Sequence, residues 1–113
     1  MSSVKVNTVL GPISPDDMGV TLVHEHIIYG YPGWDGDQSV APYDHDALVR
    51  NGVDVLKNLR EEFGLKTYID ATAVDGARRV DVLKEVSEKS QVNIICSTGY
   101  YYEGEGMPKY WKF

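Results

Sequence analysis

The sequence has little of several features that would indicate particular classes of protein. It contains one cysteine, Cys96, so no internal disulfide can form, and a reducing compartment is favoured. Only 11 residues are Lys or Arg, against 17 Asp or Glu, and the formal charge is -6, which argues against nucleic acid and anionic membranes as partners. No apolar run approaches the roughly 18 residues of a membrane span, and the first residues do not resemble a signal peptide. We therefore expect a cytoplasmic protein.

What the chain does contain is typical of one α/β domain. Its 113 residues are 42% apolar and 25% charged. Apolar runs predict strands at 20–28, 66–72 and 91–98, and residues 4–13 predict a short extended segment or hairpin ahead of them. Helical spacing predicts one helix from Asp44 to Phe63, with Gly64 as its cap, and a second over about 79–89. A loop at 29–43 is long enough to be functional.

The order strand, helix, strand, helix, strand predicts a parallel sheet covered by helices. Three parallel strands alone leave both sheet edges without partners. We therefore expect residues 1–113 to be an incomplete single domain, the first part of a larger one. The residues expected to face the sheet are Leu48, Val55, Leu56, Leu59 and Phe63 in the first helix and Val80, Leu83 and Val86 in the second.

Two of the three histidines, His24 and His26, lie one residue apart after the apolar run of the first predicted strand. Residues two apart on a strand point to the same side, so both rings can reach one metal ion, while Glu25 points away. Imidazole nitrogen is a common zinc ligand. The alternative is that both histidines are exposed and have no chemical role.

Asp70 and Thr72 lie near the end of the second predicted strand. Either could orient a histidine ring by accepting its N–H. Asp70 could instead cap a turn or pair with Arg78. After the third strand come Tyr100, Tyr101 and Tyr102, which could form one wall of a pocket or only cover the end of the sheet.

Three segments together resemble the N-terminal part of the phosphotriesterase family, within the amidohydrolase superfamily. They are VNTVLGPISPDDMGVTLVHEHI, TYIDATAVDGARR and NIICSTGYYYEGEGMPKYW. The resemblance implies a (β/α)8 TIM barrel, of which this chain would supply about the first three strands, preceded by a short N-terminal strand pair.

The same resemblance implies a metal-dependent hydrolase. In it two divalent ions, expected to be zinc, activate a hydroxide that attacks a lactone, ester or phosphoester. His24 and His26 match ligands of the more buried ion, and Tyr101 matches an aromatic residue beside the metal centre that contacts substrate. A tyrosine there favours lactones. The remaining ligands come from later strands of the barrel, so no catalytic residue is expected within this chain, which should be inactive alone.

The expected partner is a small-molecule ester or lactone, with no nucleic acid and no membrane, and the sequence leaves a homo-oligomer open. A different interpretation is a truncated, non-catalytic relative that binds metal weakly or serves as a protein-interaction module. Its open sheet edge would then be the contact surface.

Overall fold

The computed structural model describes residues 4–31, 33–37, 39 and 43–101. In chain order its strands and α-helices are β1 (Val6–Thr8), β2 (Gly11–Ile13), β3 (Val20–Glu25), α1 (His45–Phe63), β4 (Leu65–Asp70), α2 (Val80–Ser90) and β5 (Asn93–Cys96). Short 3-10 helices lie at Pro15–Asp17, Trp34–Gly36 and Val74–Gly76.

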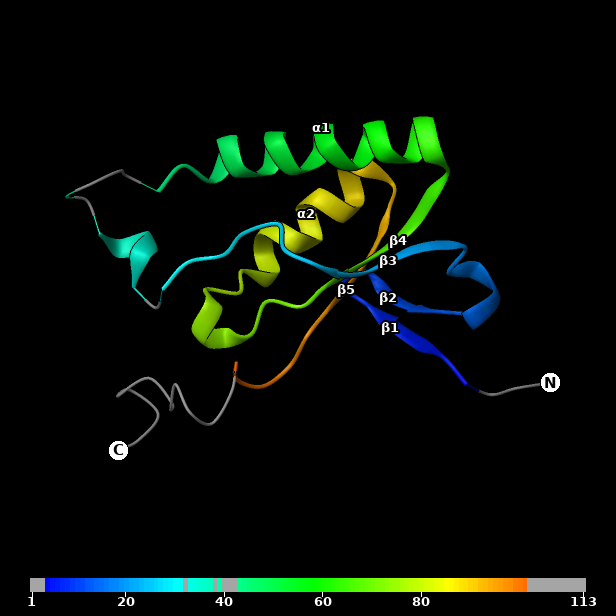
Figure 1. Ribbon diagram of the computed structural model, residues 1–113, viewed down its shortest axis with the longest axis horizontal. Helices are drawn as coiled ribbons and strands as arrows, with labels where there is room; N and C mark the ends of the chain where they lie inside the picture. The colour runs from blue at the N-terminus through cyan, green and yellow to red at the C-terminus, as the bar shows by residue number, and fades with distance from the viewer. Residues whose placement is uncertain (1–3, 32, 38, 40–42, 102–113) are drawn as a thin grey trace.

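The main sheet has the order β3-β4-β5, and both strand pairs are parallel. Each parallel connection runs through a helix, and Figure 1 shows α1 and α2 lying over the same side of the sheet. The prediction of an α/β arrangement with three parallel strands is therefore confirmed. The strand pair β1-β2 is an antiparallel hairpin, also as predicted, and it reaches β5 through a hydrogen bond of 2.9 Å from Val9 N to the Ile94 carbonyl.

Helix α1 begins and ends where the sequence predicts. The Asp44 carboxylate accepts a hydrogen bond of 2.9 Å from Ala47 N, which satisfies one of the unpaired N–H groups of the first turn. At the other end Gly64 adopts a left-handed conformation, with a φ of 70°, and its N–H bonds the Arg60 carbonyl at 3.0 Å. Glycine reaches this φ without the steric penalty of a Cβ atom.

The side of each helix that packs on the sheet differs in part from the prediction. Val55, Phe63 and Val80 were expected to face the sheet, but they are 56%, 68% and 46% exposed. Helical spacing alone allows two overlapping apolar stripes on α1, and the packed stripe contains Val49 and Gly52. The core is formed by Val49, Val53, Leu56, Leu65, Tyr68, Val82, Leu83, Val86, Val92 and Ile94.

The three central strands are shorter than predicted. Each was expected to continue two or three residues further, but β3 ends at Glu25, β4 at Asp70 and β5 at Cys96. Just beyond these ends, Ile27 N and Thr72 N bond the Asp70 carboxylate instead of the backbone of a neighbouring strand. His26 and Thr72 therefore lie just beyond their strands. Within the described part of the chain, no helix is long and apolar enough to cross a membrane.

Candidate metal and substrate site

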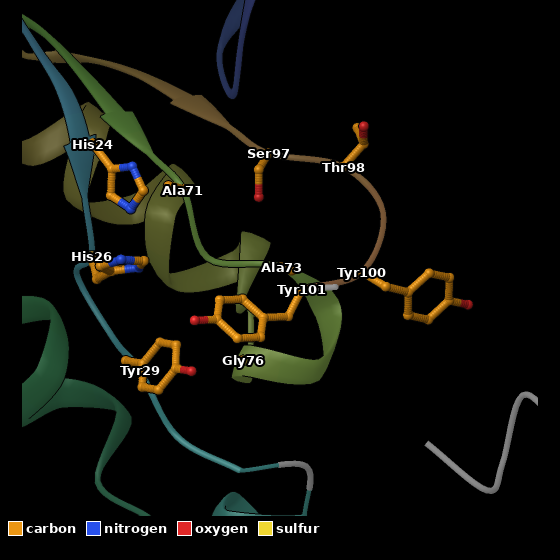
Figure 2. Close-up of a pocket in the computed structure, with 10 residues that line it drawn as sticks. All are labelled: His24, His26, Tyr29, Ala71, Ala73, Gly76, Ser97, Thr98, Tyr100 and Tyr101. Carbon is orange, nitrogen blue, oxygen red and sulfur yellow. The ribbon is translucent and has the colours of Figure 1, made fainter. Parts of the chain in front are cut away.

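His24 and His26 project into one pocket, as the sequence predicts. Their ring centroids are 5.4 Å apart and the ring planes meet at 73°. Figure 2 shows both rings on the same side of the β3 segment. Simple alternation along a strand is not the reason. Leu22 pairs with Tyr68 and Glu25 with Asp70, so β3 advances three residues while β4 advances two, and His26 lies beyond the strand end.

The pocket has a volume of about 500 Å³ and lies where the three parallel strands end. Segments that follow β3, β4 and β5 all contribute to its lining, together with His24 at the end of β3. The lining residues are His24, His26, Tyr29, Ala71, Ala73, Gly76, Ser97, Thr98, Tyr100 and Tyr101. In parallel α/β folds, the carboxyl end of the strands is where binding sites form. Polar groups from separate parts of the sequence meet here for that reason.

One of the two supporting roles predicted for Asp70 and Thr72 is observed. The hydroxyl oxygen of Thr72 lies 2.8 Å from Nδ1 of His26. It also lies 3.1 Å from the carbonyl oxygen of Ile28. Thr72 is 2% exposed, so both contacts are largely shielded from water. The ring of His26 is thereby tied to the segment that follows β4.

Asp70 contacts backbone rather than a histidine ring. Its Oδ2 accepts from Ile27 N and its Oδ1 accepts from Thr72 N, each at 2.9 Å. The expected alternative of a pair with Arg78 is wrong, because Arg78 donates to the Ser97 carbonyl at 2.8 Å. The carboxylate is 1% exposed, and a buried carboxylate needs such hydrogen bonds. Asp70 thus joins the segments that follow β3 and β4.

Further hydrogen bonds tie the three strand ends together. Ala71 N donates to the Glu25 carbonyl at 2.8 Å, and Ser97 N donates to the Asp70 carbonyl at 2.9 Å. The Ser97 hydroxyl donates to the Thr72 carbonyl at 2.7 Å. Sequence reasoning placed Ser97 within the third strand and gave it no role. The signal was a Ser-Thr pair directly after an apolar run, a position where a hydroxyl can bond the neighbouring chain.

Tyr101, the residue expected to contact substrate, lines the pocket. Figure 2 shows its phenol directed toward the histidine side and that of Tyr100 directed away. Its side chain is 59% exposed, and its backbone N–H donates to the Asp75 carboxylate at 2.7 Å. Tyr102, the third residue of the expected aromatic wall, lies outside the described residues.

Sequence reasoning missed Tyr29. Its ring centroid is 5.4 Å from that of His26, in an edge-to-face arrangement. The available signal was its position as the first residue of the long loop after the predicted strand.

Tyr68, on β4, is a buried residue of the core. Burial raises the pKa of Tyr68 well above its ordinary value, the carboxylates of Asp70 and Glu25 raise it further, and a hydrogen bond with the His26 backbone opposes the rise. Tyr68 is therefore uncharged at neutral pH.

The two imidazoles fit part of a metal site. Their nitrogen atoms are ligands that zinc prefers, and both rings project from one segment into the same pocket. Catalytic zinc sites use about three protein ligands. Among the residues the structure describes, no group of three or more His, Cys, Asp or Glu side chains could hold a metal ion. The described residues therefore offer two ligands and not a complete site.

The family follows from comparison with known proteins. The sequence model of the phosphotriesterase family matches residues 4–110. The chain belongs to the phosphotriesterase family. Among solved structures, an organophosphorus hydrolase from Deinococcus radiodurans is 42% identical with a TM-score of 0.85, over 96% of this chain and 32% of that one. A mutant of a phosphotriesterase-like lactonase from the same organism is 40% identical with a TM-score of 0.83, over 94% and 33%.

An N-acetyltaurine hydrolase from Salmo salar is a third relative. It is 32% identical, over 89% of this chain and 36% of that protein. The chain thus spans about a third of the length of the relatives it matches. The solved relatives are (β/α)8 barrels, and the three parallel strands with their preceding hairpin match part of that barrel. The predicted fold class is therefore confirmed.

Proposed function

We propose that this chain supplies two metal ligands and one wall of the substrate pocket in a metal-dependent hydrolase of lactones, other esters or phosphoesters. The observation that carries the proposal is the convergence of the His24 and His26 rings, 5.4 Å apart, at the carboxyl ends of parallel strands. Membership of the phosphotriesterase family supports hydrolysis as the reaction class.

His24 and His26 would hold the more buried of two divalent ions, with zinc the expected metal. Such ions act as Lewis acids toward water and toward the substrate oxygen. The protein's own part is to hold the two rings in place, and the contacts of Thr72 and Asp70 do so for His26 and the segment around it. Because two imidazoles are fewer than the protein ligands of a catalytic zinc site, we expect the 113-residue chain alone to be inactive.

The pocket suits a small molecule. A cavity of about 500 Å³ lies within the range of small-ligand sites. The Tyr101 phenol points to its histidine side and can donate a hydrogen bond to a carbonyl or ring oxygen, which favours a lactone. The relatives differ in what their names describe: a lactonase, an organophosphorus hydrolase and an N-acetyltaurine hydrolase. Phosphoesters and amides are therefore the substrates to compare with lactones.

The first experiment measures zinc affinity of the chain by competition with a chromophoric chelator. His24→Gln and His26→Gln each remove one donor and should weaken binding at least about tenfold. His45→Gln is the matched control, because His45 lies on α1 with its Nε2 2.8 Å from the Glu85 carboxylate, outside the pocket lining. Equal affinity in all three variants would exclude the histidine pair as the metal site.

The second experiment tests substrate class in a chimera. This chain would replace the matching third of the Deinococcus radiodurans organophosphorus hydrolase, to which it is 42% identical. Lactone, aryl phosphotriester and N-acetyl amine substrates would be compared. Tyr101→Phe should lower kcat/KM for the lactone by about 3- to 10-fold, the equivalent of one hydrogen bond, and Tyr100→Phe should not. A loss confined to the amide would overturn the lactone assignment.

One observation favours the interaction-module alternative. Strand β3 is an edge of the described sheet, and it exposes Val20 and Val23, which are 56% and 69% exposed. An edge strand with exposed apolar residues can pair with another chain. Sedimentation of the chain detects self-association, and so tests both this alternative and a homo-oligomer. Zinc affinity separates the proposals, because only the metal-site proposal predicts a specific effect of His24→Gln and His26→Gln on it.

A further inference from the structure

Every polar atom of Thr72 has a partner. Its N–H donates to Asp70 Oδ1 at 2.9 Å, and its carbonyl accepts from the Ser97 hydroxyl at 2.7 Å. Its hydroxyl oxygen lies 3.1 Å from the Ile28 carbonyl oxygen and 2.8 Å from Nδ1 of His26. The hydroxyl therefore cannot rotate without breaking a hydrogen bond in a site that is almost fully buried.

The protons at this junction can be counted. A threonine hydroxyl has one proton to donate, and a carbonyl oxygen can only accept. If the Thr72 proton goes to the Ile28 carbonyl, the bond to His26 must be made by a proton on Nδ1. The opposite arrangement would send the Thr72 proton to Nδ1 and leave the Ile28 carbonyl without its hydroxyl donor. The first arrangement makes two hydrogen bonds and the second makes one.

We propose that Thr72 is a positioning residue that holds His26 as the neutral tautomer with its proton on Nδ1. The lone pair is then on Nε2, the nitrogen not engaged by Thr72. The consequence for metal binding rests on the proposed function: Nε2 of His26 is the atom that would bind the ion, and the orientation of the ring is set before the ion arrives.

Asp70 holds both ends of this contact. One carboxylate oxygen binds the N–H of Ile27, the residue after His26, and the other binds the N–H of Thr72 itself, each at 2.9 Å. The backbone beside each partner of the His26–Thr72 hydrogen bond is therefore bonded to the same buried carboxylate. Asp70 fixes the distance between the backbone segments that carry His26 and Thr72, and the Thr72 hydroxyl fixes the orientation of the His26 ring.

His24 provides an internal comparison. Its ring contacts that of His26 edge to face, but it forms no hydrogen bond with any residue that the structure describes. Nothing comparable to Thr72 therefore selects its tautomer. A change at Thr72 should alter the nitrogen signals of His26 and leave the tautomer ratio of His24 as it was.

The tautomer is measured directly by 15N NMR of the chain labelled at histidine. The sequence has three histidines, so His24→Gln, His26→Gln and His45→Gln assign the signals by difference. At a pH where the ring is neutral, we expect a pyrrole-type shift for Nδ1 of His26 and a pyridine-type shift for Nε2. On addition of Zn²⁺ the Nε2 signal should move. An Nε2–H tautomer in the unsubstituted chain would overturn the inference without any variant at Thr72.

Two substitutions then separate the hydroxyl from the bulk of the side chain. Thr72→Val keeps the shape and removes the hydroxyl, and we expect a mixture of His26 tautomers and a Zn²⁺ affinity lower by about 10- to 100-fold. Thr72→Ser keeps the hydroxyl and should restore both. If Thr72→Val leaves the tautomer and the affinity unchanged, Thr72 has no positioning role.

The failure of this inference differs from failure of the proposed function. If His26→Gln does not weaken Zn²⁺ binding, the metal site itself is wrong, whatever the tautomer. If His26→Gln weakens binding and Nδ1 of His26 still carries no proton, the metal site stands and the role of Thr72 is wrong. Backbone amide signals of each variant show whether it has kept its fold, and the measurement on the unsubstituted chain does not depend on them.

Discussion

The side of the sheet that the helices cover and the carboxyl ends of its strands are both buried, but by different interactions. Under the helices, Leu56, Val86 and Ile94 are each fully buried among apolar neighbours. At the strand ends, Asp70 and Thr72 are 1% and 2% exposed, and their polar atoms are bonded to specific partners. Apolar packing has no direction, whereas a hydrogen bond needs a particular atom in a particular place. Substitutions of equal size should therefore be tolerated in the first region and not in the second.

The largest effect is expected in the helix-covered core. Leu56→Ala removes a fully buried side chain and should lower the free energy of unfolding by about 2–5 kcal/mol, since it leaves a cavity. Leu56→Met conserves volume and should cost less than about 1.5 kcal/mol. Val55→Ala, at a neighbouring position that is 56% exposed, should change the stability by about 0.5 kcal/mol or less. Urea unfolding measures all three, and equal losses would show that the packed stripe is misassigned.

The next largest effect is expected at Asp70. Its replacement by Asn leaves the side-chain volume almost unchanged, so the result compares the hydrogen-bonded strand ends directly with the apolar core. Asp70→Asn replaces one accepting oxygen with an NH2 group, which cannot accept from the N–H of Ile27 or of Thr72. We expect a loss of about 1.5–3 kcal/mol, more than for Leu56→Met, and a weaker Zn²⁺ affinity because both backbones of the His26 contact shift. If Asp70→Asn and Leu56→Met cost the same, the proposed difference between the two regions is wrong.

A smaller effect tests how closely the two helices pack. A Cβ atom at Gly52 would lie 3.0 Å from Cγ2 of Val86, closer than ordinary contact. Gly52→Ala should therefore destabilise the chain by about 1 kcal/mol, because crowding outweighs the gain in helix propensity. Asn51→Ala is the control at an exposed position of the same helix, where the gain in propensity alone should be neutral or stabilising. Stabilisation by Gly52→Ala would mean that α1 and α2 can separate at no cost.

The smallest effect is expected on the solvent side of the helices. A hydrogen bond from Lys89, and then one from His45, lower the pKa of Glu85 below its ordinary value. The stabilisation that the Glu85 carboxylate gives the folded chain is therefore fully present above the pKa of Glu85 in the unfolded chain, about 4.3. It is lost as pH falls through the lower pKa of Glu85 in the folded chain. The difference in urea midpoint between the chain and Glu85→Gln should be small near pH 6 and should shrink by pH 3. Glu88→Gln, on the same helix, is the control for loss of a charge, and a difference that grows in acid would contradict the assignment.

Much of the fold could be predicted from local patterns. Asp44 and Gly64 mark the ends of α1 because capping depends on residues within one turn of the helix. The order of strands and helices, and with it the parallel sheet, follows from apolar runs of the right length. The stripe of α1 that packs was assigned only in part, because Val55 and Val53 fit helical spacing equally well until a sheet is present to cover one of them.

The candidate site was predictable to a similar degree. The pair His24 and His26 was found from spacing, although His26 lies beyond the strand and its ring contacts Thr72, which is distant in the sequence. Thr72 and Asp70 were both considered as supports for a histidine ring, and no sequence pattern could say which would reach the ring. Ser97 and Tyr29 were missed because their partners are distant in the chain.

By itself, the sequence determined the order of elements, the two ends of α1, the family, and His24 and His26 as the candidate metal ligands, because each depends on neighbouring residues or on a motif. The tertiary structure decided which atoms of Asp70, Thr72 and Ser97 meet at the strand ends and which nitrogen of His26 is engaged. Those contacts join segments from three different strands, and their geometry exists only once the strands lie side by side in register.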